Sequence, residues 1–508
     1  MAKTKSRTDK LTDFLLGDHP KFFAIKTLPL EFLSPETKTV LTSLLGQDDQ
    51  GKLDKALLDI KPLQSLWKKL IIDSIHFLRI NDFRERAFFV DSVSKEKTKM
   101  TTDGSDRAAI SNAYGIKELN DYFEQFTEFE ALLYGSDRFY RDHVQHPIKV
   151  WLIGMHILDK FGEQFACRTA NSFKIEKADF ANPEWAQFKE KKEGKGEEIQ
   201  RISTAELMAM WTIAALTHDL GYPLEKVEKI NEQLEKMVRH FGNVGFTKSK
   251  VNFQTQHDHL VKFLIKIMSS NVHLNSKETS IHKDSCWYTH VRPKYASKFS
   301  KSWQHFDHGF VSSLILLRSL TFFIETDAST DQIVFLSSED ARQFVIRSEI
   351  LHTIAAHTTP KVYHLTANTL PFLLVLCDEL QEWGRPTMAD LRHGKIKGDL
   401  VEAVRIKTCH ISPKQSEIEC EIEYGEKETY KNQEQIARRV FQSWHEKLRP
   451  AVDDEKRKMK FKWTLKFPDS SLPWEFSLDS NGQVFKQFVF KGPTEADKST
   501  GADHSLYQ

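Results

Sequence analysis

The stretch ELMAMWTIAALTHDLGYP, residues 206–223, runs through apolar side chains and ends with the adjacent pair His218-Asp219. The apolar run predicts a helix, and Gly221 and Pro223 predict that this helix ends just after the pair. Imidazole and carboxylate groups are both good ligands of divalent metals. Neighbouring residues on a regular helix point about 100° apart, but at a helix end they can converge. The pair is therefore either a simple helix end or part of a metal site that needs partners elsewhere in the chain.

The bulk composition narrows the class of protein. The chain has 508 residues, with 72 basic and 71 acidic side chains and a formal net charge of +1. This balance gives no overall field that would favour nucleic acid or an anionic membrane. No apolar run reaches the roughly 18 residues of a membrane span, and the first residues lack a secretory signal. The five cysteines contain no C-x-x-C pair, which argues against a zinc ribbon or a disulfide framework. We expect a cytoplasmic protein with no membrane contact.

Four more segments place a histidine or an aspartate at the end of, or within, an apolar helical pattern. They are RFYRDHVQHPIKVWLIGMHIL (138–158), WQHFDHGFVSSLILL (303–317), EILHTIAAHTTP (349–360) and LPFLLVLCDELQEWGRP (370–386). The candidate ligands in them are His146, His308, His357 and Asp378. A carboxylate such as Asp378 inside an apolar run is costly unless it is paired or metal-bound. Helix bundles build metal sites from such side chains on facing helices.

Taken in order, these residues resemble the HD-domain metal-dependent phosphohydrolases, whose signature is H…HD…D on a helical core. The resemblance covers roughly residues 136–392. It implies that the metal is bound by His146, His218, Asp219 and Asp378. A binuclear subset of the family has two further histidines between the HD pair and the last aspartate, and these match His308 and His357.

The resemblance implies a phosphohydrolase that uses metal-activated water to cleave a phosphoester or phosphoanhydride bond of a nucleotide, with His218 and Asp219 as the catalytic pair. One or two divalent ions are expected, and Mn, Fe, Mg, Zn, Ni and Co are all suitable. Two alternatives stay open. One is a nuclease acting on single-stranded nucleic acid, to which the cations and aromatic residues of DEKRKMKFKWTLKF (454–467) could contribute. The other is a regulatory module that senses a nucleotide without turnover.

Four residues near the predicted ligands are weaker candidates for binding the substrate's phosphate. They are Arg141, His143, Lys226 and Arg385. The two arginines flank the first and the last ligand and could hold phosphate through two hydrogen bonds. Surface ion pairs are the simpler explanation for the arginines, and His143 could equally cap its helix.

We expect a mainly α fold, with a helical bundle core of the HD type, and four regions along the chain. They are a helical N-terminal region (1–118), the HD-type domain (119–399) with inserts near 172–201 and 228–302, a small α+β domain (400–490), and a disordered tail (491–508). Within the second insert, the polar composition of residues 269–302 predicts irregular structure.

The α+β domain is predicted from a change of hydrophobic period after about residue 400. SEIECEIEY (416–424) and KMKFKWTLKF (458–467) alternate as strands do, and LPWEFSLDSNGQVFKQFVF (472–490) predicts a hairpin around Asn481-Gly482. We expect this domain to supply no metal ligand and not to join the bundle. An edge strand at KFKWTLKF would suit homo-oligomerisation.

Overall fold

The computed structural model gives the arrangement of the residues whose placement it describes. These are residues 28–45, 60–80, 115–133, 145–162, 175–176, 202–242, 255–275, 286–324, 335–336, 338–358, 365–381, 404–412, 417–424, 433–448, 450–452, 459–467, 473–479 and 487–491. Three of the predicted phosphate-binding residues, Arg141, His143 and Arg385, lie outside them, as do the tail after residue 491 and nearly all of the insert near 172–201.

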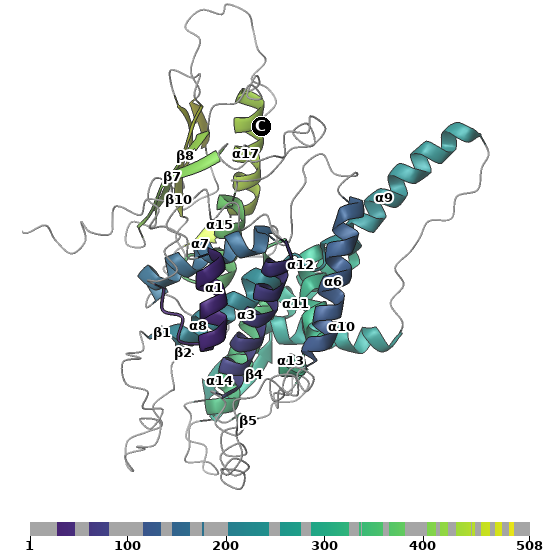
Figure 1. The fold of residues 1–508 in the computed structure, drawn as a ribbon, viewed down its shortest axis with the longest axis vertical. Coiled ribbons are helices and arrows are strands. Elements are labelled where there is room, and N and C mark those ends of the chain that lie inside the picture. Colours follow the sequence, from purple (N-terminus) through teal and green to yellow (C-terminus); the bar gives the residue numbers. More distant parts are fainter. Residues whose placement is uncertain are drawn as a thin grey trace, which may run out of the picture.

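Most of the described residues form a bundle of helices, so the expected mainly α fold is confirmed. Its helices are α1 (Pro35–Leu45), α3 (Ile60–Ile80), α6 (Ile116–Leu133), α7 (Gln145–Phe161), α8 (Thr204–Thr217), α9 (Tyr222–Val238), α10 (Thr255–Ser269), α11 (Pro293–Gln304), α12 (His308–Ser319), α13 (Thr321–Ile324), α14 (Ser338–Ala356) and α15 (Leu370–Leu380). Figure 1 shows the bundle below the C-terminal strands, with α9 projecting from its side. Among the described helices, none combines the length and the apolar character that crossing a bilayer requires.

Helix α8 lies at the centre of the bundle. Every residue from Ala205 to Thr217 is buried, and α8 packs against α3, α7 and α14. A helix that is surrounded by other helices must be apolar on all faces, which explains the uninterrupted apolar run before the HD pair. The bundle therefore delivers the end of α8, and with it His218, into its interior.

The N-terminal helices share this core. The Trp67 ring of α3 stacks on Phe123 of α6, with the ring centroids 3.9 Å apart and the planes nearly parallel. The expected boundary at residue 118 falls inside α6, which begins at Ile116. Helices α3 and α6 thus wrap the same core as α8.

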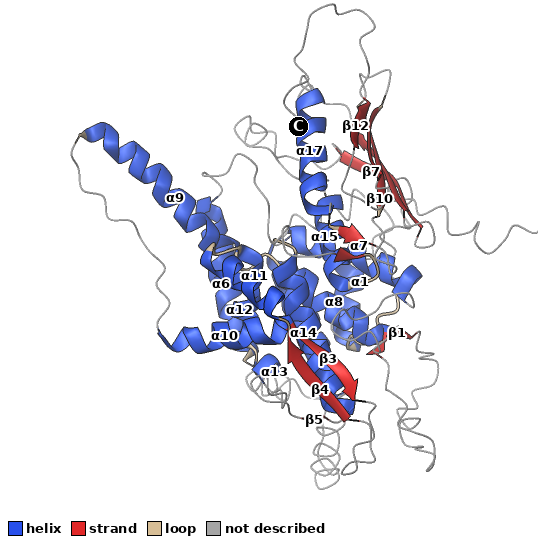
Figure 2. Cartoon of the chain, turned by 180° about the vertical axis from the view of Figure 1, so that it is seen from behind, coloured by secondary structure: helices blue, strands red, loops and turns tan. Residues whose placement is uncertain are grey.

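Residues 269–302 are not irregular where the structure describes them. Strands β3 (Ser270–Asn275) and β4 (Cys286–Val291) form an antiparallel pair, which Figure 2 shows beside α14, and β5 (Phe335–Leu336) extends it. Val272 and Trp287 are buried, whereas His273 and His290 are exposed. The strands thus alternate as half-buried strands do, although the polar residues between them dominate the composition of the segment.

The C-terminal region is the small α+β unit expected from the sequence. Its sheet has the order β12-β11-β10-β8-β7. The strands are β7 (Val404–Ser412), β8 (Glu417–Tyr424), β10 (Lys460–Lys466), β11 (Trp474–Asp479) and β12 (Gln487–Lys491), and the helix is α17 (Gln433–Leu448). Strands β11 and β12 pair antiparallel, as the predicted hairpin requires, while Asn481-Gly482 lies outside the described residues.

One expectation about this unit is wrong. Strand β10, which carries KFKWTLK, is not an edge strand, because β11 and β8 pair with its two sides. Its apolar residues are buried under α17, where the Trp463 and Trp444 rings lie 4.1 Å apart. The unit also touches the bundle, because α17 packs against α15 and the short strands β6 (Leu365–Thr366) and β9 (Ala451–Val452) pair.

Candidate metal centre

Helix α8 begins with a capping box and ends at the HD pair. Ser203 caps the helix by accepting from the backbone N–H of Glu206, whose carboxylate accepts in return from the backbone N–H of Ser203. At the other end, the Nδ1 atom of His218 lies 2.7 Å from the carbonyl oxygen of Ala215. A carbonyl only accepts, so Nδ1 carries the hydrogen and Nε2 presents its lone pair in the opposite direction.

The carbonyl groups at the end of α8 find donors on three other helices. The Trp67 indole N–H donates to the oxygen of Leu216 at 2.7 Å, and the Tyr122 hydroxyl donates to that of Leu220 at 2.6 Å. The Ser312 hydroxyl lies 2.7 Å from the carbonyl oxygen of His218. The last carbonyls of a helix lack partners within it, and here α3, α6 and α12 supply them. The turn that carries the HD pair is therefore fixed from several directions.

Two glycines let the helices approach closely around this turn. A Cβ atom at Gly221 would lie 2.3 Å from the carbonyl oxygen of His308, and one at Gly309 would lie 2.6 Å from that of Ile354. Both distances are far shorter than carbon–oxygen contact allows. These positions bring α12 against the HD turn and against the end of α14.

Four histidines surround the Asp219 carboxylate. Its Oδ2 atom lies 3.3 Å from Nε2 of His218 and 3.6 Å from Nε2 of His146. Its Oδ1 atom lies 3.3 Å from Nε2 of His308 and 3.5 Å from Nε2 of His357. The two oxygens of one carboxylate thus face two pairs of imidazoles.

Asp378, the sixth predicted residue, lies with His146 on one side of Asp219. The Oδ1 atom of Asp378 on α15 lies 3.1 Å from Nε2 of His146. We call His146, His218 and Asp378 the Asp378 side, and His308 with His357 the His308 side. The side chain of His308 is 19% exposed, and those of the other five residues are at most 4% exposed. His308 is therefore the most exposed of the six side chains.

The outer atoms of these side chains are also engaged. The Nδ1 atom of His357 lies 2.6 Å from the carbonyl oxygen of Ile354, and that of His308 lies 2.5 Å from Oε2 of Glu225. The Nδ1 atom of His146 contacts the side-chain amide oxygen of Gln381. In each case an oxygen atom accepts a hydrogen bond from Nδ1, so that Nε2 faces the centre. Histidines that bind metals usually have such a partner on their outer nitrogen.

The charges within the centre shift the pKa values of its groups. Burial alone would lower the pKa of His308, but the hydrogen bonds with Asp219 and Glu225 raise it to about 9. Burial and the neighbouring His218 and His308 lower the pKa of His357 to about 4, despite its contact with Asp219. Burial would raise the pKa of Asp219, yet the surrounding imidazoles hold it well below its usual range. Without a metal, protons on histidine thus balance the carboxylate, and a bound cation would displace them.

The donor set fits a divalent metal. The ligand atoms of His146, His218 and Asp378 lie within 4.8 Å of one another, and so do those of His218, Asp219 and His357. Among the described residues, no hydrogen-bond partner is found for the buried Nε2 atom of His218 or the buried Oδ2 atom of Asp219. A buried polar atom without a partner is costly, and a cation between these atoms would remove that cost. Nitrogen and carboxylate oxygen suit Mn, Fe, Zn and related ions.

All six predicted ligands therefore lie together, each at the predicted end or interior of its helix. Lys226 lies beside them: its Nζ atom is 4.5 Å from the centroid of the Tyr222 ring, whose edge-to-face neighbour is His308 at 5.7 Å. For Arg141, His143 and Arg385 the phosphate-binding role stays a prediction.

Sequence reasoning missed three residues that contact the ligands: Glu225, Gln381 and Lys447. Gln381 follows Asp378 by three positions, a spacing that places two side chains on one helix face, so that signal was present. Glu225 stands in the first turn of the helix after the HD pair, but nothing in the sequence indicates its contact with His308. Nothing in the sequence indicates that Lys447 contacts Asp378, because Lys447 belongs to the C-terminal unit.

Comparison of the chain with protein-family models, curated proteins and solved structures gave no match. The chemistry of the centre therefore has to be inferred from its own residues.

Proposed function

We propose that the chain is a metal-dependent phosphohydrolase of the HD-domain type that acts on a nucleotide. The observation that supports this function most is the convergence of four histidines and two aspartates, from five helix ends or interiors, on one small volume of the bundle interior. All of the histidine and aspartate side chains in this group present nitrogen or oxygen to the same small volume. A structural role would not require six such groups in the interior of an apolar bundle.

The two sides of Asp219 suggest that the ligands would be divided between two ions. His146, His218 and Asp378 would hold one, His308 and His357 the other, and Asp219 would contact both. When bound, such ions lower the pKa of water and polarise a phosphoryl oxygen. The chain itself orients the imidazoles through Nδ1 and keeps bulk water away from the Asp378 side. The substrate's phosphate would then approach on the His308 side.

A second candidate, hydrolysis of single-stranded nucleic acid, is favoured by the surface of α11. Residues 286–306 contain no acidic residue. The guanidinium of Arg292 lies 4.4 Å from the centroid of the Tyr295 ring. Burial and the nearby Lys294 lower the pKa of Lys298, so cations are crowded here. Cations next to aromatic rings suit a single strand, and α11 ends four residues before His308.

The basic stretch predicted to bind nucleic acid gives no such support. In the described part of DEKRKMKFKWTLKF, Lys462 and Lys466 lie 3.6 Å and 2.6 Å from the carboxylates of Glu419 and Glu421 on the neighbouring strand. These glutamates balance the charge of the two lysines. The nucleotide therefore remains the first candidate, and α11 is the surface on which the second depends.

A substrate screen tests the function. The purified chain is analysed for bound metal and then incubated with a panel of nucleotides and a labelled single-stranded oligonucleotide, each with Mn²⁺, Mg²⁺, Fe²⁺, Zn²⁺, Ni²⁺ or Co²⁺. We expect phosphate release that stops in the presence of a chelator and in the folded His218→Ala variant. A chain that binds no divalent ion, or that turns over equally with His218→Ala, would contradict the proposal. Cleavage of the oligonucleotide alone would favour the second candidate.

A further inference from the structure

One cation from the C-terminal unit reaches the metal centre. Lys447 lies in the last turn of α17, and its Nζ atom is 3.0 Å from Oδ2 of Asp378. The same ammonium group forms an ion pair with Glu379, the next residue of α15. The predicted ligand Asp378 therefore uses its two oxygens differently: Oδ1 faces His146, and Oδ2 is held by Lys447.

Glu379 attaches α17 to this turn of α15 at two further points. The Ser443 hydroxyl donates to Oε2 of Glu379 at 2.9 Å, and the Trp444 indole N–H donates to its backbone oxygen at 3.4 Å. The Trp444 ring also packs on Trp463 of the sheet. The helix that delivers Lys447 is therefore fixed to the bundle on one face and to the C-terminal sheet on the other.

The electrostatic setting makes this lysine more than a surface ion-pair partner. The side chains of Asp378 and Glu379 are only 3% and 4% exposed, and that of Lys447 is 25% exposed. Two neighbouring buried carboxylates are costly without a cation close by. Removing the ammonium group would leave both carboxylates without this cation and would take away the ion pair between Lys447 and Oδ2 of Asp378.

We propose that Lys447 is a positioning residue of the metal centre, which fixes the Asp378 carboxylate so that Oδ1 faces His146, and that it thereby couples metal affinity to the seating of the C-terminal unit on the bundle. This inference rests on the metal binding of the proposed function and not on its substrate. It replaces the picture of residues 400–490 as a separate unit with one in which α17 supports the ligand shell.

Two effects of Lys447 on a bound ion oppose each other. Its charge repels a divalent cation, but Glu379 shares that charge and the lysine is partly exposed to solvent, which screens it. Its orientation of Asp378 favours the ion, and outer partners of metal ligands typically contribute about 10–100-fold to affinity. Orientation therefore outweighs repulsion, and the loss of Lys447 should weaken binding.

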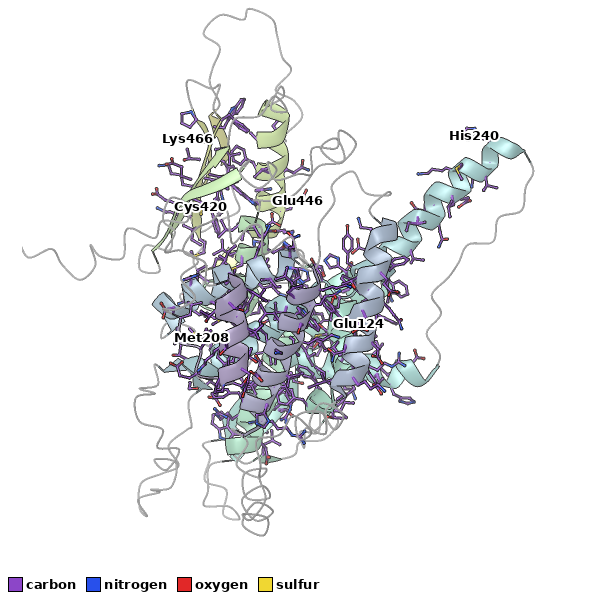
Figure 3. The ribbon with its side chains drawn as sticks, viewed as in Figure 1. Glu124, Met208, His240, Cys420, Glu446 and Lys466 are labelled. Atoms are coloured by element: carbon purple, nitrogen blue, oxygen red, sulfur yellow. The ribbon has the colours of Figure 1, made fainter. Side chains whose placement is uncertain are left out.

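The test uses the full-length chain and three variants. Lys447→Met removes the charge at similar length, and Lys447→Arg keeps it. Lys466→Met is the matched control, because Lys466 lies on the sheet of the same unit, away from α15 (Figure 3). Lys466 pairs with Glu421, and its side chain is 41% exposed. Mn²⁺ affinity is measured by electron paramagnetic resonance, the absorption spectrum of the Co²⁺ form reports ligand geometry, and thermal unfolding reports stability.

We expect Lys447→Met to weaken Mn²⁺ binding about 10-fold or more and to change the Co²⁺ spectrum, while the folded state persists. Lys447→Arg should restore most of the affinity, and Lys466→Met should match the parent chain. If Lys447→Met does not fold, Lys447→Gln, which keeps a polar group, should show the same weakening. If Lys447→Met binds Mn²⁺ as tightly as the parent chain or more tightly, this inference is overturned and the proposed function is left intact. A parent chain without divalent-metal binding would overturn both it and the proposed function.

Discussion

The two sides of Asp219 both present histidines to its carboxylate, but only the Asp378 side adds a second carboxylate, and the surroundings of the two sides differ. On the Asp378 side the ligands are buried, and they are supported by Gln381 and Lys447. On the His308 side, His308 is partly exposed and its outer partner is the carboxylate of Glu225. Under the proposed function, the buried Asp378 side would hold its ion permanently, and an ion on the more exposed His308 side would meet the substrate. The surroundings of the two sides would then give two ions separate tasks around one shared carboxylate.

The largest effect is expected from the removal of Asp219, the residue that the two sides share. Asp219→Ala should reduce the metal content from about two ions per chain to none and abolish hydrolysis, because Asp219 contacts histidines of both sides. Elemental analysis and phosphate release measure the two effects, and circular dichroism checks the fold. Retention of both ions would show that the sides do not depend on a common bridge.

Removing one histidine from each side should separate the two ions. His146→Ala and His308→Ala should each lower the metal content from about two ions to about one, since each imidazole faces a different oxygen of Asp219. The stoichiometry is measured by titration with Mn²⁺ under identical conditions. Equal loss of both ions in either variant would mean that the sides form a single site.

A smaller change tests the role of the His308 side by itself. Glu225→Gln keeps an acceptor near Nδ1 of His308 but removes its charge. We expect the affinity of one ion to fall by about 10–100-fold, while the other ion binds as before. Glu232→Gln, at an exposed position of the same helix, is the control and should bind both ions normally. A fall in both affinities would place Glu225 outside the role assigned to it.

The smallest expected effect concerns substrate rather than metal. Lys226→Ala should leave the metal content unchanged and raise KM by less than about 10-fold, because the ammonium group lies over Tyr222, which contacts His308, and the residue is only half-buried. Steady-state kinetics with the best nucleotide of the screen measure it. A change in kcat without a change in KM would count against phosphate binding by Lys226.

The candidate ligands could be picked out of the sequence because each is a polar residue at a position where a packed helix normally has an apolar one. Asp378 lies within an apolar helix, and His218, His308 and His357 lie at the ends of such helices, so polar groups recur where packing alone would not put them. Their mutual distances needed the structure. The order of the ligands along the chain came from the family resemblance, and the helices around them were evident from hydrophobic periodicity.

What the sequence did not reveal depends on tertiary contacts. Lys447 stands in an ordinary amphipathic helix, and only the docking of α17 on α15 brings it to Asp378. The strands β3 and β4 were hidden by the polar residues between them. The position of β10 inside its sheet could not be read from its own alternation, because an edge strand and an inner strand share that pattern when one face is covered.

The hydrogen bonds from Trp67 and Tyr122 to the carbonyls of Leu216 and Leu220 have a kinetic consequence. The first bond joins residues that are 149 positions apart in the chain, and the second joins residues that are 98 positions apart. Contacts between distant chain positions form slowly, because the loops between them must close first. The turn that carries the HD pair therefore reaches its final shape only when most of the bundle has assembled. Ion capture should then be a late step of folding, and a captured ion would draw the equilibrium toward the finished fold by mass action.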